Sequence, residues 1–240
     1  MTARPSWTKW TNALRLACLN ADGVRGRTQE LHHFLGQYGI DIGLLTVNHL
    51  RSGEVFRLAN IVCHRNDRLT EGGGTAILVR RAIDHHAVRI QGLQHLVFTA
   101  VQAMFASKPV KILAAYLSPT RPSIDSDLSA CLSGGLPVLV AGDLNGKHVE
   151  WNSRLTTERG KHLRDYADKN SYLIYGPSAP TTVPYSPSAT PDVPDIIITK
   201  DLIASVYLAT YSAMSSDHLA LLNDTHCRSF SLRPPGFEED

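Results

Sequence analysis

The stretch Leu136-Pro137-Val138-Leu139-Val140-Ala141-Gly142-Asp143-Leu144-Asn145 says more about the fold than any other part of this chain. A short apolar run rich in β-branched residues predicts a buried strand, and Gly142 is the kind of residue that ends one. An acid, Asp143, and an amide, Asn145, follow at once. The stretch therefore predicts a buried strand whose end carries polar, chemically active groups.

Working outward, short apolar or alternating runs predict strands, and apolar residues at helical spacing predict helices. The expected strands are residues 14–20, 40–46, 61–64, 75–79, 96–106, 110–117, 136–141, 173–175, 195–199 and 206–209, and the expected helices are residues 28–38, 124–132 and 159–169. Residues 177–194 contain six prolines and predict a long surface loop. Many strands with interspersed helices favour an α+β layering, two packed sheets with helices outside.

The composition is that of a folded domain. At 240 residues the chain is long enough for one well-buried α/β domain, which we expect over residues 14–228, with residues 1–13 as an extension and residues 229–240 as a tail or linker. A net charge of +2 excludes a strongly basic nucleic-acid-binding chain but allows a local basic patch. The four cysteines have no CxxC spacing, which disfavours a zinc or redox site. We see no secretory signal and no membrane span, so we expect a soluble protein of a reducing compartment.

Polar residues recur where expected strands begin or end. Strand ends on one rim of a sandwich converge in space, so these groups could share one site. In chain order they are Asn20 and Asp22, Tyr116, Asp143 and Asn145, Asp195, and Asp217 with His218.

Taken in order, Asn-x-Asp-Gly, Tyr, Gly-Asp-x-Asn, Asp and Ser-Asp-His resemble the endonuclease/exonuclease/phosphatase superfamily, which includes apurinic endonucleases and DNase I, from about Leu14 to Leu222. Gly142-Asp143-Leu144-Asn145 with Trp151-Asn152-Ser153, then Thr190-Pro191-Asp192 and Ser216-Asp217-His218, are similar to the endonuclease of insect-type non-LTR retrotransposons. Among those, we note a resemblance to elements that insert into telomeric repeats. The resemblance implies a four-layered, DNase I-like α/β sandwich.

The same resemblance implies a function. It is metal-dependent nicking of double-stranded target DNA, which leaves a 3′-hydroxyl to prime reverse transcription. It also implies a reverse transcriptase C-terminal to this domain in an intact element, and a nuclear location. An apurinic-site or general nuclease of the same fold, and a catalytically dead DNA-binding module, remain alternatives. A phosphoinositide or sphingomyelin phosphodiesterase fits less well, because the stretches around Trp151 and Thr190 are retrotransposon-like.

The implied catalytic roles suit the residue types. His218 would contact the scissile phosphate as an imidazolium, held in orientation by Asp195. Asp143 would orient or deprotonate the attacking water. Neutral groups would complete the catalytic set. The side-chain amides of Asn20 and Asn145 would position Asp143 and the phosphate, and the phenol of Tyr116 would donate to the phosphate.

The metal site is where the sequence departs from the family. Asp22 and Asp217 would lie near a hard cation, Mg²⁺ or Mn²⁺. The main metal ligand of the family is a Glu within Glu-Thr-His-Leu, and here the stretch is Val47-Asn48-His49-Leu50. An isopropyl group cannot ligate a cation, so Val47 predicts impaired or absent nuclease activity. If the strand continues, Asn48 points to the opposite face, and Glu54 reaches inward only if the loop folds back.

Several side chains near these motifs are candidate DNA contacts. A simpler role exists for each: a solvated charge, a loop cap for His148, or a core anchor for Trp151. The candidates are Arg25, Arg27, Lys147, His148, Trp151, Arg154 and Thr182. The pairs His32-His33 and His85-His86 are more typical of exposed helix or turn positions than of a metal site.

Overall fold

The structure is a computed structural model that describes residues 13–67, 73–105, 108–121, 125–186, 188–202, 204–214 and 216–227. The first of two six-stranded sheets has the order β11 (Ala204–Tyr211), β12 (Ala220–Cys227), β1 (Ala13–Asn20), β2 (Ile42–Thr46), β4 (Thr75–Arg80) and β3 (Ile61–Asn66). The second has the order β5 (His85–Ala87), β6 (Val97–Phe105), β7 (Lys108–Tyr116), β8 (Val138–Asp143), β10 (Asp195–Lys200) and β9 (Leu173–Tyr175). The helices are α1 (Thr28–Gln37), α2 (Asp125–Leu132), α3 (Glu158–Asn170) and the 3₁₀ turn η1 (Val149–Trp151).

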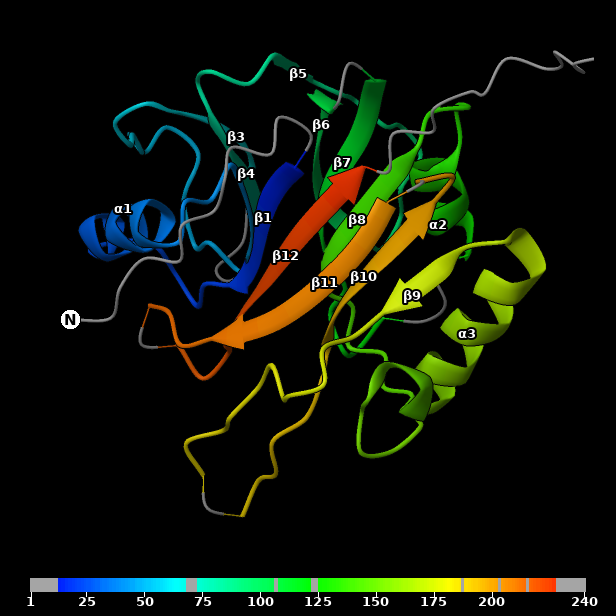
Figure 1. The fold of residues 1–240 in the computed structure, drawn as a ribbon. Helices are drawn as coiled ribbons and strands as arrows, with labels where there is room; N and C mark the ends of the chain where they lie inside the picture. The colour runs from blue at the N-terminus through cyan, green and yellow to red at the C-terminus, as the bar shows by residue number, and fades with distance from the viewer. Residues whose placement is uncertain are drawn as a thin grey trace, which may run out of the picture.

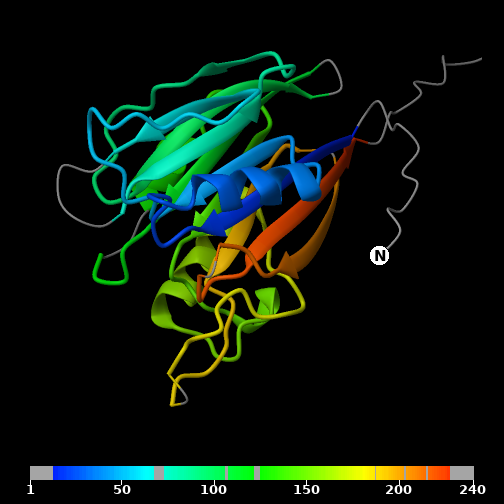
Figure 2. The same cartoon turned by 90° about the vertical axis from the view of Figure 1, so that its left-hand side faces the viewer.

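The two sheets pack face to face, and helices cover both outer faces (Figures 1 and 2). Strand β1 shows how the sequence builds these layers, because successive side chains of a strand point to opposite faces. Leu16 and Cys18 belong to the core between the sheets, whereas Ala17 and Leu19 pack in the cluster under α1. A third cluster lies between the second sheet and helices α2 and α3. The predicted four-layered, DNase I-like sandwich is confirmed.

The predicted strands and helices are present, with ends shifted by a few residues. Two strands lie outside the predicted ranges. They are β12, which follows the Ser216-Asp217-His218 motif, and β5, where His85 and His86 lie in a strand rather than in a helix or turn. His32 and His33 are exposed on α1 as expected. The proposed terminal extension and tail lie almost wholly outside the described residues. Among the described helices, none has the length and apolarity needed to span a bilayer.

Side-chain parity brings the predicted site together. Cys18, Ala141 and Ile197 face the core between the sheets. Residues two positions along the same strands share that face, so Asn20, Asp143 and Asp195 point to the same side at the rim. Asp143 and Asp195 are also direct cross-strand neighbours in the antiparallel pair β8–β10.

Gly142, the residue before Asp143, is required by packing. A Cβ at this position would lie 1.8 Å from the backbone oxygen of Ala115 on β7. Any side chain here would push β8 away from β7. The Gly-Asp pair therefore reflects a close strand approach next to a functional acid.

Candidate active site

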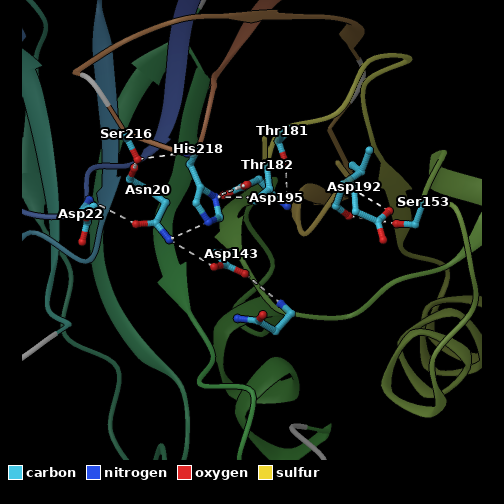
Figure 3. Close-up of polar contacts among 12 residues, drawn as sticks. Asn20, Asp22, Asp143, Ser153, Thr181, Thr182, Asp192, Asp195, Ser216 and His218 are labelled. Carbon is cyan, nitrogen blue, oxygen red and sulfur yellow. Dashed lines mark hydrogen bonds and ion pairs between the residues drawn. The ribbon is translucent and has the colours of Figure 1, made fainter. Parts of the chain in front are cut away.

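Four side chains meet at the rim between the sheets. The Nδ2 of Asn20 donates to Oδ2 of Asp143 at 3.2 Å and lies 3.5 Å from Nε2 of His218. The Nδ1 of His218 pairs with Oδ2 of Asp195 at 2.9 Å. Ligand atoms of Asp143, Asp195 and His218 all lie within 4.8 Å of one another. Residues from β1, β8, β10 and the segment before β12 therefore form one polar cluster (Figure 3).

The segment before β12 is fixed by Ser216. Its hydroxyl donates to the backbone oxygen of Asn20 and accepts from the backbone N–H of His218, both at 3.1 Å. These bonds tie the His218 backbone to the end of β1. Ser216 was recognised in the sequence as part of a motif but not as a site residue.

Part of the proline-rich loop is built into the site. Thr182 forms single β-bridges with both Asp192 and His218, and its hydroxyl is 3.5 Å from Nδ1 of His218. Thr181, fully buried, accepts from the backbone N–H of Asp195 at 3.3 Å. Thr182 was predicted as a DNA contact, whereas nothing in the sequence pointed to Thr181. The rest of the loop projects from the body of the molecule, as the yellow segment of Figure 1.

The turn after β8 orients the carboxylate of Asp143. Asn145 adopts a left-handed backbone (φ 50°), and its N–H donates to Oδ1 of Asp143 at 3.1 Å. Its side-chain amide instead donates to the oxygen of Leu117 at 3.0 Å, and the Leu117 N–H donates to the backbone oxygen of Asp143 at 3.0 Å. Asn145 therefore holds Asp143 through its backbone. Its side chain fixes the residue that follows Tyr116, the last residue of β7.

The charges of the cluster are strongly coupled. Burial raises the pKa of Asp143 and the neighbouring Asp195 raises it further; His218 offsets part of this, and the pKa is about 7. Burial lowers the pKa of His218, but its hydrogen bond and ion pair with Asp195, with further help from Asp143 and Asp217, raise it to about 9. At neutral pH His218 is therefore a cation facing a pair of buried acids.

This charge state leaves two donors side by side. In an imidazolium both ring nitrogens carry protons, so Nε2 of His218 cannot accept from Nδ2 of Asn20. The two N–H groups instead converge on the space next to Asp143. They suit a shared anionic acceptor such as a phosphate oxygen.

Comparison with known proteins agrees with this geometry. The family model described as "Endonuclease-reverse transcriptase" matches residues 110–222. The computed fold superposes on "Endonuclease domain of TRAS1, a telomere-specific non-LTR retrotransposon" with a TM-score of 0.72 and 16% identity, covering 88% of this chain and 98% of that one. The family match covers a little under half of this chain, and the superposition shows a shared fold.

Further proteins show similar likenesses. The fold is also similar to that of the AP endonuclease LMAP of Leishmania major, with a TM-score of 0.69 and 10% identity over 91% of this chain and 89% of that one. The chain is 27% identical over 217 residues to the RNA-directed DNA polymerase from mobile element jockey of Drosophila funebris, and 25% identical over 229 residues to the probable RNA-directed DNA polymerase from transposon BS of Drosophila melanogaster. These matches include 89% and 93% of this chain, but only 24% and 25% of the length of the two relatives.

A divalent cation fits the acid cluster. Among the described residues, Oδ1 of Asp195 is buried and has no hydrogen-bond partner. When both carboxyl groups are ionised, the one imidazolium leaves the cluster with a net negative charge. Hard cations prefer such carboxylate oxygens. Asp22 and Asp217 are not in this cluster. Asp22 is exposed and lies on the far side of Asn20 from Asp143 (Figure 3), and the backbone oxygen of Asp217 accepts from Val183.

Val47 lies at the same rim. Strand β2 ends at Thr46, and the backbone oxygen of Val47 accepts from the N–H of Gly23 at 2.8 Å, beside the Asn20–Gly23 turn. Val47 adopts φ 53°, a left-handed conformation that is an outlier for a β-branched residue. Val47 stands where the resemblance implies a metal-binding Glu. Its side chain offers no ligand atom for a metal, and its backbone is strained.

The neighbours of Val47 do not replace the missing acid. The idea that the strand continues through Asn48 is wrong: Asn48 is fully buried, and its Oδ1 accepts from the N–H of Leu50 at 2.9 Å. The carboxylate of Glu54 forms an ion pair with Arg25 and accepts from the N–H of Arg51 at 3.0 Å. Glu54 is thus engaged away from the acid cluster.

Three predicted DNA contacts are turned inward. Trp151 is 2% exposed and donates from Nε1 to Gly146, so it cannot stack on a base. Arg27 donates from Nη1 to the backbone oxygens of Met214 (2.9 Å) and Ala21 (3.4 Å), joining the turn after β1 to the segment before β12. Lys147 pairs with Asp192 at 2.9 Å and fastens the proline-rich loop. Sequence alone could not separate Arg27 and Lys147 from free cations, because Met214 and Asp192, which bind them, are remote in the chain.

The other predicted DNA contacts lie nearer the surface. Arg154 and Arg25 are exposed, and Arg25 is paired with Glu54. His148 is half-buried, accepts from the N–H of Glu150 at 3.2 Å as the cap of η1, and packs on Trp151. Arg154 is therefore the candidate whose charge is most open to a phosphate.

Proposed function

We propose that this chain is the endonuclease domain of a non-LTR retrotransposon and nicks one strand of duplex DNA in the nucleus. The 3′-hydroxyl that it leaves would prime a reverse transcriptase carried elsewhere in the element, C-terminal to this domain. The observation that carries the proposal is the pair of N–H donors on Asn20 and His218 that converge beside Asp143. The likeness to polymerases of mobile elements supports the biological setting.

The residues of the site can carry out phosphodiester hydrolysis. His218, held as an imidazolium by Asp195, binds a phosphate oxygen and stabilises the charge that develops there. Asn20 donates to the same phosphate while also holding Asp143. Asp143, with a pKa of about 7, accepts the proton of the attacking water. Tyr116, at the end of β7, supplies a phenol to the phosphate.

A bound Mg²⁺ or Mn²⁺ would polarise the phosphate and stabilise the leaving oxygen. Asp143 and Asp195 would hold it, since their oxygens lie in one cluster and Oδ1 of Asp195 has no hydrogen-bond partner in the part of the chain that the structure describes. Asp22 and Asp217 add negative charge at the rim. Val47 contributes nothing, and we propose that cation binding and nicking are impaired for that reason.

Nicking of supercoiled plasmid in Mg²⁺ tests the function. We expect the His218→Gln protein to lose nicking; nicking at the wild-type rate in that variant would refute the proposed site. Duplexes with telomeric repeats, random sequence and an abasic site form three further arms. The likeness to a telomere-specific element makes telomeric repeats the substrate that we expect to be cut fastest. A strong preference for the abasic site would instead favour a repair-type nuclease.

The role of Val47 is tested by Val47→Glu, with Val47→Gln as the uncharged control of equal size. Restoring an acid should raise the nicking rate by at least about 10- to 100-fold, the scale on which even the partners that orient metal ligands act, and the Gln variant should not. Equal rates for wild type and Val47→Glu would end the impairment hypothesis. DNA binding in gel shifts with no nicking in any divalent metal would favour the second candidate, a catalytically dead DNA-binding module, which Val47 specifically suggests.

A further inference from the structure

Arg159 lies where helix rules do not favour it. It is the second residue of α3, in the first helical turn, where the helix dipole disfavours a positive charge. It is half-buried, and burial lowers the pKa of its guanidinium, partly offset by the nearby Asp143 and Tyr116. Both the helix dipole and burial disfavour the charge of Arg159 at this position, so we look for its role in contacts outside the helix.

The guanidinium contacts two loops at once. Nη2 lies 3.2, 2.9 and 2.5 Å from the backbone oxygens of Ser118, Pro119 and Arg121, in the loop after β7. Nη1 lies 3.4 Å from the backbone oxygens of both Leu144 and Asn145, in the turn after β8. The first loop follows Tyr116 directly, and the second follows Asp143.

We propose that Arg159 is a positioning residue that locks the loop after β7 against the turn after β8, and so sets Tyr116 and Asn145 relative to Asp143. The inference rests on the proposed function. It extends the contact already made by the Asn145 side chain, which donates to Leu117 in the same loop. Without the guanidinium, one amide hydrogen bond and one backbone hydrogen bond would have to hold the two segments together.

The helix that carries Arg159 cannot shift to follow a loose loop. A Cβ on Gly160 would lie 1.7 Å from the backbone oxygen of Lys147, so the first turn of α3 is packed directly on the chain just past Asn145. The cap residue Thr157 also exchanges hydrogen bonds with Lys147. Arg159 therefore reaches the loops from a rigid base.

The contacts demand an arginine. A guanidinium presents five N–H donors in a planar fork, whereas an ammonium is a point charge with three. Only the fork can serve oxygens of two separate loops from fixed positions. Lys at this position would keep the charge near Asp143 but lose one loop.

The test compares Arg159→Met and Arg159→Lys with Lys161→Met. Lys161 is a matched control, because it is an exposed cation two residues further along α3 that pairs only with Glu158 among the described residues. Hydrogen–deuterium exchange of peptides covering residues 117–121 and 144–147 is measured without any substrate. We expect faster exchange, by at least about tenfold, in both segments of the Met variant, in at least one segment of the Lys variant, and in neither segment of the control.

Nicking is then measured in the wild-type and Val47→Glu backgrounds. A misplaced site should lower kcat by about 100-fold, the usual effect of a 1 Å displacement, in Arg159→Met, with DNA affinity unchanged. Unchanged exchange in Arg159→Met would overturn the inference, and so would a loss confined to DNA affinity, which would make Arg159 a phosphate contact. If no background nicks, the proposed function fails, and the exchange data still decide whether Arg159 locks the loops.

Discussion

Replacing Asp143 by Asn should make the protein more stable while removing its activity. Asp143 is 4% exposed, and its pKa is raised from the ordinary 3.8 to about 7 by burial and by Asp195. Between these two values the folded protein keeps a proton on Asp143 that the unfolded chain has released. The free energy of unfolding therefore falls as pH rises from about 4 to about 7, and the loss persists above pH 7.

The size of the effect follows from the pKa. One pKa unit corresponds to about 1.4 kcal/mol, so the raised pKa of Asp143 lowers stability at pH 8 by about 4 kcal/mol. An Asn cannot ionise and avoids this penalty, but it weakens the bond from Asn20 by about 1 kcal/mol. We expect Asp143→Asn to raise the free energy of unfolding by about 3 kcal/mol at pH 8 and to have little effect at pH 4.

Urea unfolding of both proteins at pH 4, 6 and 8 measures this difference. Asp127→Asn is the control with the opposite sign. Burial raises the pKa of Asp127, but the backbone N–H groups of Gln94, His95 and Leu96 outweigh it and hold the pKa below its ordinary value. That substitution should destabilise at pH 8 and less so near pH 3. An Asp143→Asn protein that is less stable than wild type at pH 8, or equally shifted at all pH values, would refute the electrostatic account.

Three more predictions concern the charges of the site and of its surroundings. The nicking rate should rise through about pH 7 as Asp143 ionises and fall above about pH 9 as His218 loses its proton. In Asp195→Asn the fall at high pH should move toward pH 6.5. A pH profile unchanged by that substitution would contradict the ion pair between His218 and Asp195. Arg27→Met should lower the free energy of unfolding by about 1–2 kcal/mol and leave the salt dependence of DNA binding unchanged, because Arg27 binds backbone oxygens. Arg154→Met should leave the free energy of unfolding unchanged and lower the slope of log DNA affinity against log salt concentration by about one. Equal slopes for Arg154→Met and wild type would exclude a phosphate contact.

The amino-acid sequence determined the layers and the candidate site. Strand patterns in β1, β8 and β10 repeat every two residues, and that period alone assigns Cys18 and Asn20, or Ala141 and Asp143, to one face. Gly142 marked the end of a buried strand just before a functional acid. These properties are local, which is why one sequence is enough to predict them.

Tertiary structure decided what each polar group does. Arg27, Lys147 and Arg159 look alike as charges in a sequence, yet all three bind oxygens of segments far from them in the chain. Trp151 is buried because it packs in the cluster between the second sheet and helices α2 and α3, which brings residues from distant parts of the chain together. The pKa of Asp143 depends on Asp195, 52 positions further along the chain, and on the loss of water around both. Burial and long-range pairing arise only when the sheets close, so no local pattern encodes them.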